Sequence, residues 1–190
     1  KNLLIKKKST QGMSLVELLL VVGLAAIILA GMFVAYNKVQ STNAANTEST
    51  NISTLRAGVK NLYGSSTSYT GLTNAVLLNA RVVPDNMREA TGAVGATAIT
   101  NSFGGAVVIT PSTFGTGAQP NNAFQIVYPR VPADVCAKLV VAVAQSFDRV
   151  VAGSQTVKNT SSATGNAINV ANAATGCNVN GGASITMTSL

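Results

Sequence analysis

One carboxylate inside an apolar run has the clearest chemical consequence in this sequence. The stretch from Met13 to Tyr36, MSLVELLLVVGLAAIILAGMFVAY, contains a single charged residue, Glu17. A carboxylate within a membrane segment costs about 2.5–3.5 kcal/mol on insertion scales, and such a group usually has a partner or a role. No Lys or Arg lies within the same segment to neutralise it. Glu17 therefore needs a cation that this segment does not supply.

Two cysteines, Cys136 and Cys177, form the second candidate for chemistry. Their separation is too wide for a C-x-x-C redox motif, and the absence of His excludes a mixed Cys/His zinc site. In an oxidising periplasm two such cysteines can pair. A bridge across this loop would stabilise the domain by about 4 kcal/mol on the chain-entropy model. The alternative is two buried free thiols.

Residues for catalysis are sparse, and we predict that the chain is not an enzyme. With no His, a Ser-His-Asp triad and most general acid–base pairs are unavailable. Outside the first helix the acidic residues are Asp85, Glu89, Asp134 and Asp148, and their spacing does not indicate a hydrolytic pair. The sequence has no P-loop and no dinucleotide fingerprint. We therefore expect no cofactor and no metal.

The positive charge of the chain does not indicate a nucleic-acid partner. The formal charge is +7, from 13 basic and 6 acidic residues, but four of the basic residues (Lys1, Lys6, Lys7 and Lys8) precede the apolar run. The remaining nine against six leave +3, and these charges are scattered rather than arranged as a basic stripe with aromatics. Charged residues make up only 10% of the chain, against about 25% in an average soluble domain.

The apolar run is long enough to cross a membrane. At about 1.5 Å per residue, a helix of 24 residues extends about 36 Å, and a hydrocarbon core is about 30 Å thick. The lysines before the run should stay in the cytoplasm, which would put the C-terminal domain outside the inner membrane. A common secretory signal is the alternative, but its apolar core is usually shorter and would not explain Glu17.

The rest of the chain predicts an α+β fold, with a long helix lying on an antiparallel or mixed sheet. Ile52, Leu55, Val59 and Leu62 form a helical stripe, flanked by polar residues that include Glu48, so we predict one helix from about Ser14 to Tyr63 with a membrane-spanning first half. The other predicted elements are helices at 73–81, 132–147 and 167–175, strands at 106–110, 123–128, 149–152 and 183–190, a turn at 100–105 and a loop at 153–165. The helix at 132–147 carries Cys136, Leu139, Val140 and Val143 on one face.

The N-terminal pattern resembles the class III signal of type IV pilins. A basic leader, Gly12, an apolar run and a glutamate five residues after the glycine occur together. The resemblance implies that a prepilin peptidase cuts after Gly12, that Met13 becomes the first residue, and that Glu17 pairs with the new N-terminal amine of a neighbouring subunit. A buried ion pair is held strongly only when both partners are present. The alternative is an ordinary membrane anchor with a stray Glu.

The body of the chain resembles the type IVb branch, as found in bundle-forming pilins and the thin pili of conjugative plasmids. The segments TSYTGL, the helix containing LLN, VVPDN and TNSFGGAVVIT carry this resemblance, and a first mature residue that is Met rather than Phe agrees with it. The resemblance implies a disulfide between Cys136 and Cys177. It also implies three parts: a leader at 1–12, a transmembrane and filament-core helix at 13–36, and a globular head at 37–190. The chain starts at Lys1, and we expect part of the leader to lie upstream.

The resemblance implies a major pilin, a structural subunit that polymerises with copies of itself. Its partners would be a prepilin peptidase, an inner-membrane assembly platform and an ATPase. The precursor would lie in the inner membrane and the product in an extracellular pilus for adhesion, aggregation or conjugative mating. The alternatives are a pseudopilin of type II secretion and a minor pilin or tip adhesin.

Overall fold

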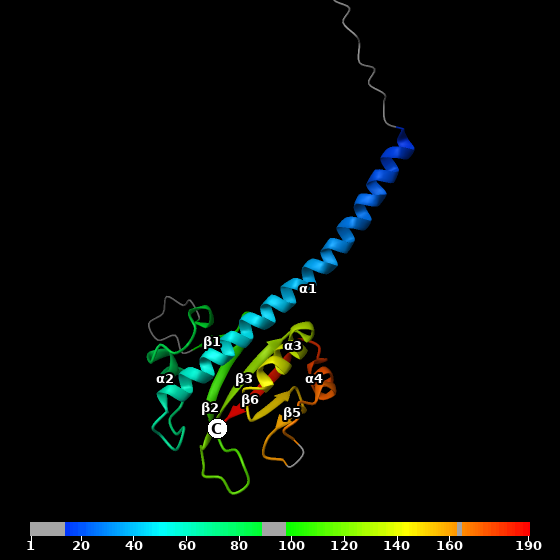
Figure 1. The fold of residues 1–190 in the computed structure, drawn as a ribbon. Helices are drawn as coiled ribbons and strands as arrows, with labels where there is room; N and C mark the ends of the chain where they lie inside the picture. Colours follow the sequence, from blue (N-terminus) through cyan, green and yellow to red (C-terminus); the bar gives the residue numbers. More distant parts are fainter. Residues whose placement is uncertain (1–13, 89–97, 163–164) are drawn as a thin grey trace, which may run out of the picture. The chain divides into compact units, whose positions relative to one another are not determined.

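The computed structural model describes residues 14–88, 98–162 and 165–190, and the chain divides into two compact units, Lys1–Gln40 and Ser41–Leu190. Helix α1 (Leu15–Leu62) runs through both units without a break, as the blue-to-cyan helix in Figure 1 shows. The predicted helix from about Ser14 to Tyr63 is therefore confirmed to within one residue at each end.

In the first unit, α1 has the length and composition of a membrane span. Its most apolar stretch has a mean hydropathy of 2.9, and none of that stretch is buried in the chain. Within the described residues it is the one helix that is long and apolar enough to cross a bilayer. Length and composition thus agree with the predicted membrane-spanning half.

In the second unit, one face of α1 belongs to the hydrophobic core. Ile52, Leu55 and Val59 are fully buried, as the stripe predicted, whereas Leu62 at the end of the helix is 42% exposed. The prediction was wrong for Glu48, which we expected among the polar flanking residues. Glu48 is fully buried, because it lies on the same helical face as Ala45 and Ile52, three and four residues away.

The sheet in the second unit has six strands in the order β1-β2-β3-β6-β4-β5, and each neighbouring pair is antiparallel. Of the two predicted options, antiparallel or mixed, the structure therefore has the antiparallel one. Strands β3 and β6 are central. The bounds are β1 (Ile99–Thr100), β2 (Ala106–Ser112), β3 (Ala123–Val131), β4 (Arg149–Ala152), β5 (Gln155–Asn159) and β6 (Ala183–Ser189).

Three strands depart from the prediction. Strand β3 continues past Tyr128 through Pro129 to Val131, because a register shift between Tyr128 and Val131 accommodates the proline. The segment 153–165, predicted as loop, contains strand β5, which pairs with β4 across a tight turn at Gly153, where φ is +55°. β1 was not predicted; its second residue was assigned to a turn.

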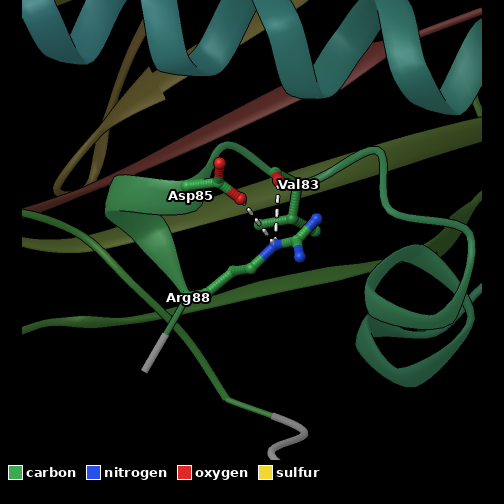
Figure 2. A network of polar contacts seen from close by, with 3 residues as sticks. All are labelled: Val83, Asp85 and Arg88. Atoms are coloured by element: carbon green, nitrogen blue, oxygen red, sulfur yellow. Dashed lines mark hydrogen bonds and ion pairs between the residues drawn. The ribbon is translucent and has the colours of Figure 1, made fainter. Parts of the chain in front are cut away.

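Two short helical segments precede β1. Helix α2 (Asn74–Asn79) lies inside the predicted 73–81 segment and begins after Thr73, whose side chain accepts a hydrogen bond from the Val76 N–H. A 3₁₀ turn, η1 (Asp85–Met87), follows Pro84. Figure 2 shows its closing contacts: Arg88 Nε donates to the Val83 carbonyl at 3.1 Å and lies 3.6 Å from Asp85 Oδ1.

Helices α3 and α4 pack on strands β6, β4 and β5 of the sheet (Figure 1). Helix α3 (Ala133–Ala144) ends three residues before the predicted Phe147, and its predicted apolar face is buried. Helix α4 (Val170–Cys177) is displaced from the predicted 167–175. The displacement arises because Asn169 caps the helix: its side-chain oxygen accepts from the Asn172 N–H at 3.0 Å, which fixes the start of α4 after Asn169.

Candidate assembly site

Glu17 lies in the first turn of α1. The first backbone bond of the helix runs from Leu18 N to the Ser14 carbonyl at 3.0 Å, so Glu17 lies where the helix dipole favours a negative charge. Within the described part of the chain, the salt bridge found joins Arg88 and Asp85, and Glu17 takes part in none. Gly12 and Met13, the predicted cleavage pair, lie outside the described residues.

The helix around Glu17 presents apolar side chains on all its faces. Every large apolar residue from Leu15 to Val39 is between 49% and 75% exposed. Burying one such side chain completely is worth about 1.5–3 kcal/mol. A surface of this kind therefore favours lipid or the equivalent helices of other copies over water.

Gly23 and Gly31 interrupt this apolar surface. A Cβ built at either position would meet nothing within 4 Å, so contacts within the chain do not require a glycine there. Small residues allow close approach of helices in membranes.

A second carboxylate of α1, Glu48, has its partners inside the second unit. Its carboxylate accepts hydrogen bonds from the Tyr128 hydroxyl, from Ser102 N at 3.0 Å and from Asn51 Nδ2 at 3.3 Å. Burial, then the hydrogen bond and the charge of Glu48, raise the pKa of Tyr128 far above its ordinary value. Glu48 thereby fastens α1 to strand β3 and to the turn after β1.

Further hydrogen bonds between polar side chains surround Glu48. Asn51 is 6% exposed, and its Oδ1 accepts from Asn86 Nδ2 at 3.2 Å, which links α1 to the 3₁₀ turn η1. Asn101, 5% exposed, donates to the Pro129 carbonyl and accepts from the Gly105 N–H at 2.8 Å. The sequence signal for this network was the position of Glu48 on the apolar stripe. Its partners come from distant segments and leave no local pattern.

The predicted disulfide is present. Cys136 in α3 and Cys177 at the end of α4 are bonded, with their Cα atoms 5.6 Å apart and a sequence separation of 41. Both cysteines are buried. Gly176 permits this arrangement, because a Cβ at that position would collide with the Ala152 carbonyl of β4. The bridge thus encloses β4, β5 and α4 in one covalent loop.

The described side chains that stand out are suited to association with other molecules. Among the described residues, no three His, Cys, Asp or Glu side chains are grouped as metal ligands would be. What the structure brings together is a carboxylate, Glu17, in the first turn of α1, an apolar helix surface around it, and a head whose parts are joined by the hydrogen bonds of Glu48 and by a disulfide.

A family model described as PilS N terminal matches residues 42–190 of the chain. Two curated relatives, from Escherichia coli O127:H6 (strain E2348/69 / EPEC) and Escherichia coli O111:H-, are each described as the major structural subunit of bundle-forming pilus. Each is 32% identical over 113 residues, which is 60% of this chain and 56% of the relative. The chain thus spans little more than half the length of the curated relatives it matches.

Solved structures resemble the chain at the level of the fold. A type IVb pilin from Salmonella typhi has a TM-score of 0.58 at 21% identity, covering 75% of this chain and 97% of its own. TcpA, a type IV pilin from Vibrio cholerae El Tor biotype, has a TM-score of 0.55 at 15% identity, covering 78% and 99%. The predicted fold, a long N-terminal helix packed on an antiparallel sheet, is confirmed.

Proposed function

The chain belongs to the PilS family of type IVb pilins, and from this premise we propose that it is the major structural subunit of a type IVb pilus. In this proposal the chain polymerises through its N-terminal helix into an extracellular filament. The 1–12 segment is the leader, 13–36 the membrane-spanning and filament-core segment, and 37–190 the head.

The observation that carries the proposal is Glu17, which makes no ion pair with the described residues, in the first turn of a helix with exposed apolar side chains. Cleavage between Gly12 and Met13 would create an ammonium group four residues before Glu17. In a growing filament this amine and the Glu17 carboxylate of a neighbouring copy form an ion pair as both leave water. The pair selects the docking position, because a copy seated elsewhere would leave both charges buried and unpaired, at a cost of about 3–5 kcal/mol.

Cohesion in the filament comes mainly from apolar burial. The side chains from Leu15 to Val39 exchange lipid for the equivalent side chains of other copies, while the head units form the outer surface. Small residues such as Gly23 and Gly31 let the helices approach closely. Van der Waals packing and the ion pair then supply the specificity that lipid cannot.

The partners of this proposal are a prepilin peptidase, an inner-membrane assembly platform and a cytoplasmic ATPase. The sequence carries no P-loop, so the energy for polymerisation comes from the ATPase. The precursor waits in the inner membrane, and the polymer extends from the bacterial surface. The filament would serve contact with surfaces or other cells, in adhesion, aggregation or conjugative mating.

Substitution at Glu17 tests the ion pair. Glu17→Ala should be processed normally but should fail to enter fibres of the unsubstituted chain, whereas Glu17→Asp should enter them in reduced amount. Ser14→Ala, which changes a polar residue in the same turn, is the matched control. Incorporation is measured by immunoblotting of sheared fibres, and ordinary incorporation of Glu17→Ala would contradict the proposal.

Substitution at Gly12 tests the processing step separately. Gly12→Val should leave an uncleaved, membrane-bound precursor of higher mass on a gel. N-terminal sequencing of the unsubstituted fibre subunit should begin at Met13. A mature chain that starts elsewhere would rule out the ion pair as described.

Fibre abundance separates the major subunit from the alternatives. Electron microscopy should show long surface fibres in which this chain is the predominant protein. A pseudopilin of type II secretion would not give long surface fibres, and a tip adhesin would be scarce in them.

A further inference from the structure

The face of the sheet that points away from the core carries a small polar cavity. Side chains alternate between the two faces of a strand, and Phe124, Ile126 and Tyr128 of β3 point into the core. Gln125 therefore lies on the opposite face. Its register partner on β6 is Thr188, whose partner on β4 is Arg149.

These three residues form a row that crosses the centre of the sheet, and a cavity of about 230 Å³ lies over it. Thr186 of β6, Ser112 at the end of β2 and Phe114 of the following loop also line the cavity. The cavity is thus bounded by four strands, β2, β3, β4 and β6, and by the loop that connects β2 to β3.

The side chains in this cavity have unused hydrogen-bonding capacity. Thr188 is only 5% exposed, and its hydroxyl has no hydrogen-bond partner in the described chain. Among the described residues, every side-chain nitrogen or oxygen without a hydrogen-bond partner is accessible to solvent. The Thr188 hydroxyl must therefore open onto the cavity. The side chains of Gln125, Arg149 and Thr186 likewise make no hydrogen bond within the described residues.

The lining has one charged group and no carboxylate. The guanidinium of Arg149 presents parallel N–H donors whose spacing matches a carboxylate. Asp148, its neighbour in sequence, accepts a hydrogen bond from the Leu190 N–H instead. Around Arg149, the hydroxyls of threonine and serine and the amide of Gln125 can each both donate and accept. Phe114 and Val151 add apolar surface.

We propose that this cavity binds an acidic monosaccharide, a sugar ring that carries one carboxylate. Arg149 holds the carboxylate, and Gln125, Thr186 and Thr188 hydrogen-bond the ring hydroxyls. A simple carboxylic acid, such as a glutamate side chain, would satisfy Arg149 but leave the other groups without partners. The volume lies below the range of about 300–1,000 Å³ for drug-sized ligands, which agrees with a single sugar ring. The ring would be supplied as a free sugar acid or as the terminal residue of a glycan.

Titration of the full chain in detergent micelles with D-glucuronic acid and with N-acetylneuraminic acid tests this inference, by calorimetry and by amide chemical shifts. At least one of the two should bind saturably, with shifts centred on Gln125, Thr186 and Thr188. D-Glucose and glutarate, which lack the carboxylate and the sugar ring respectively, should bind at least about tenfold more weakly. A hydrogen bond to a charged group is worth about 1.5–3 kcal/mol, which corresponds to about tenfold or more in affinity.

Two variants and a control connect the binding to the cavity. Arg149→Gln should weaken binding about tenfold or more and Thr188→Val about fivefold, while Arg81→Gln, which removes an exposed arginine that does not line the cavity, should leave it unchanged. Retained melting temperatures of the variants show that they fold.

The remaining outcomes are decisive as well. Three results would each overturn the proposal. They are binding of glucose or glutarate as strong as that of the sugar acids, no saturable binding of either sugar acid, and full binding by Arg149→Gln. An immobilised glycan ending in the sugar acid that binds identifies the source: retention of the chain indicates a glycan terminus, and binding of the free sugar alone indicates a soluble ligand.

Discussion

The two glutamates of α1, Glu17 and Glu48, differ in whether the described structure supplies a partner for the carboxylate. Glu17 has an apolar surface around it and no ion pair in the described structure, whereas Glu48 is fully buried and accepts from Tyr128, Ser102 and Asn51. A buried carboxylate is tolerated when donors replace its water. The partners of Glu48 therefore lie within the subunit, whereas the function proposed above gives Glu17 a partner on another copy of the chain.

Glu48→Ala should lower the free energy of unfolding of the head by about 3 kcal/mol, because the buried Tyr128 hydroxyl would be left without an acceptor and the Ser102 N–H would lose its hydrogen bond. Glu48→Gln should cost less, since the amide oxygen can still accept from both. Urea denaturation followed by circular dichroism measures the change. Glu17→Ala is the control and should leave head stability within about 0.5 kcal/mol. A fully stable Glu48→Ala variant would show that these hydrogen bonds do not contribute to folding.

Tyr128 should make the head sensitive to alkaline pH. Its pKa is raised in the folded state, so its contribution to stability is complete below the unfolded pKa of about 10 and is lost as pH rises above that value. Melting temperatures between about pH 8 and pH 11 should fall, and Tyr128→Phe should fall less steeply. The raised pKa of Tyr69 acts in the same direction and the lowered pKa of Lys60 in the opposite one. Tyr69 and Lys60 are unchanged in Tyr128→Phe. The difference in melting temperature between the variant and the unsubstituted chain, followed against pH, therefore reports the contribution of Tyr128.

At the scale of elements, the disulfide joins α3 to α4, and the loop that it closes contains β4 and β5, the two strands at one edge of the sheet. Replacing Cys136 and Cys177 together by Ser should lower the free energy of unfolding by about 4 kcal/mol, mainly because the unfolded chain gains freedom. Chemical denaturation of the double variant, compared with the oxidised chain, measures this loss. Reduction of the unsubstituted chain should give a similar loss. A change below about 1 kcal/mol would mean that the packing of α4 already fixes the loop.

The elements that could be predicted are those whose signal lies within their own residues. Helix α1 combines an uninterrupted apolar run with a stripe at Ile52, Leu55 and Val59, and its ends were predicted to within one residue. Strand β5 carries only one buried apolar residue, Val157, so it shows no run and little alternation. It is a strand because β4 offers a free edge after the turn at Gly153. The signal that makes β5 a strand therefore lies in its pairing with β4 and not in its own residues.

The same distinction holds at the candidate sites. Glu17 and the cysteine pair were visible because their residue types are unusual for their surroundings. The buried role of Glu48 depends on Tyr128, 80 residues away. The outer-face cavity depends on the register that aligns Gln125, Thr188 and Arg149, and pairing of three strands cannot be read from any one segment.

At the scale of the whole molecule, the two units require different surroundings. The large apolar side chains from Leu15 to Val39 are exposed, whereas the buried residues of the hydrophobic core all lie at Ala45 or beyond. The two halves of α1 therefore differ: the first half exposes its apolar side chains, which the proposed function places against lipid or other copies, and the second half is part of a folded core.

This division predicts that residues 41–190 fold without the first unit. Exported to the periplasm, this fragment should be a soluble monomer by size-exclusion chromatography, because its core is complete and the exposed apolar helix is absent. Its melting temperature should lie within a few degrees of that of the head in the full chain, since the truncation costs only helix continuity at Ser41, a residue type that can itself cap a helix. The full chain in the same buffer should require detergent. A fragment that aggregates, or that melts far below the full chain, would show that the first unit contributes to folding of the head.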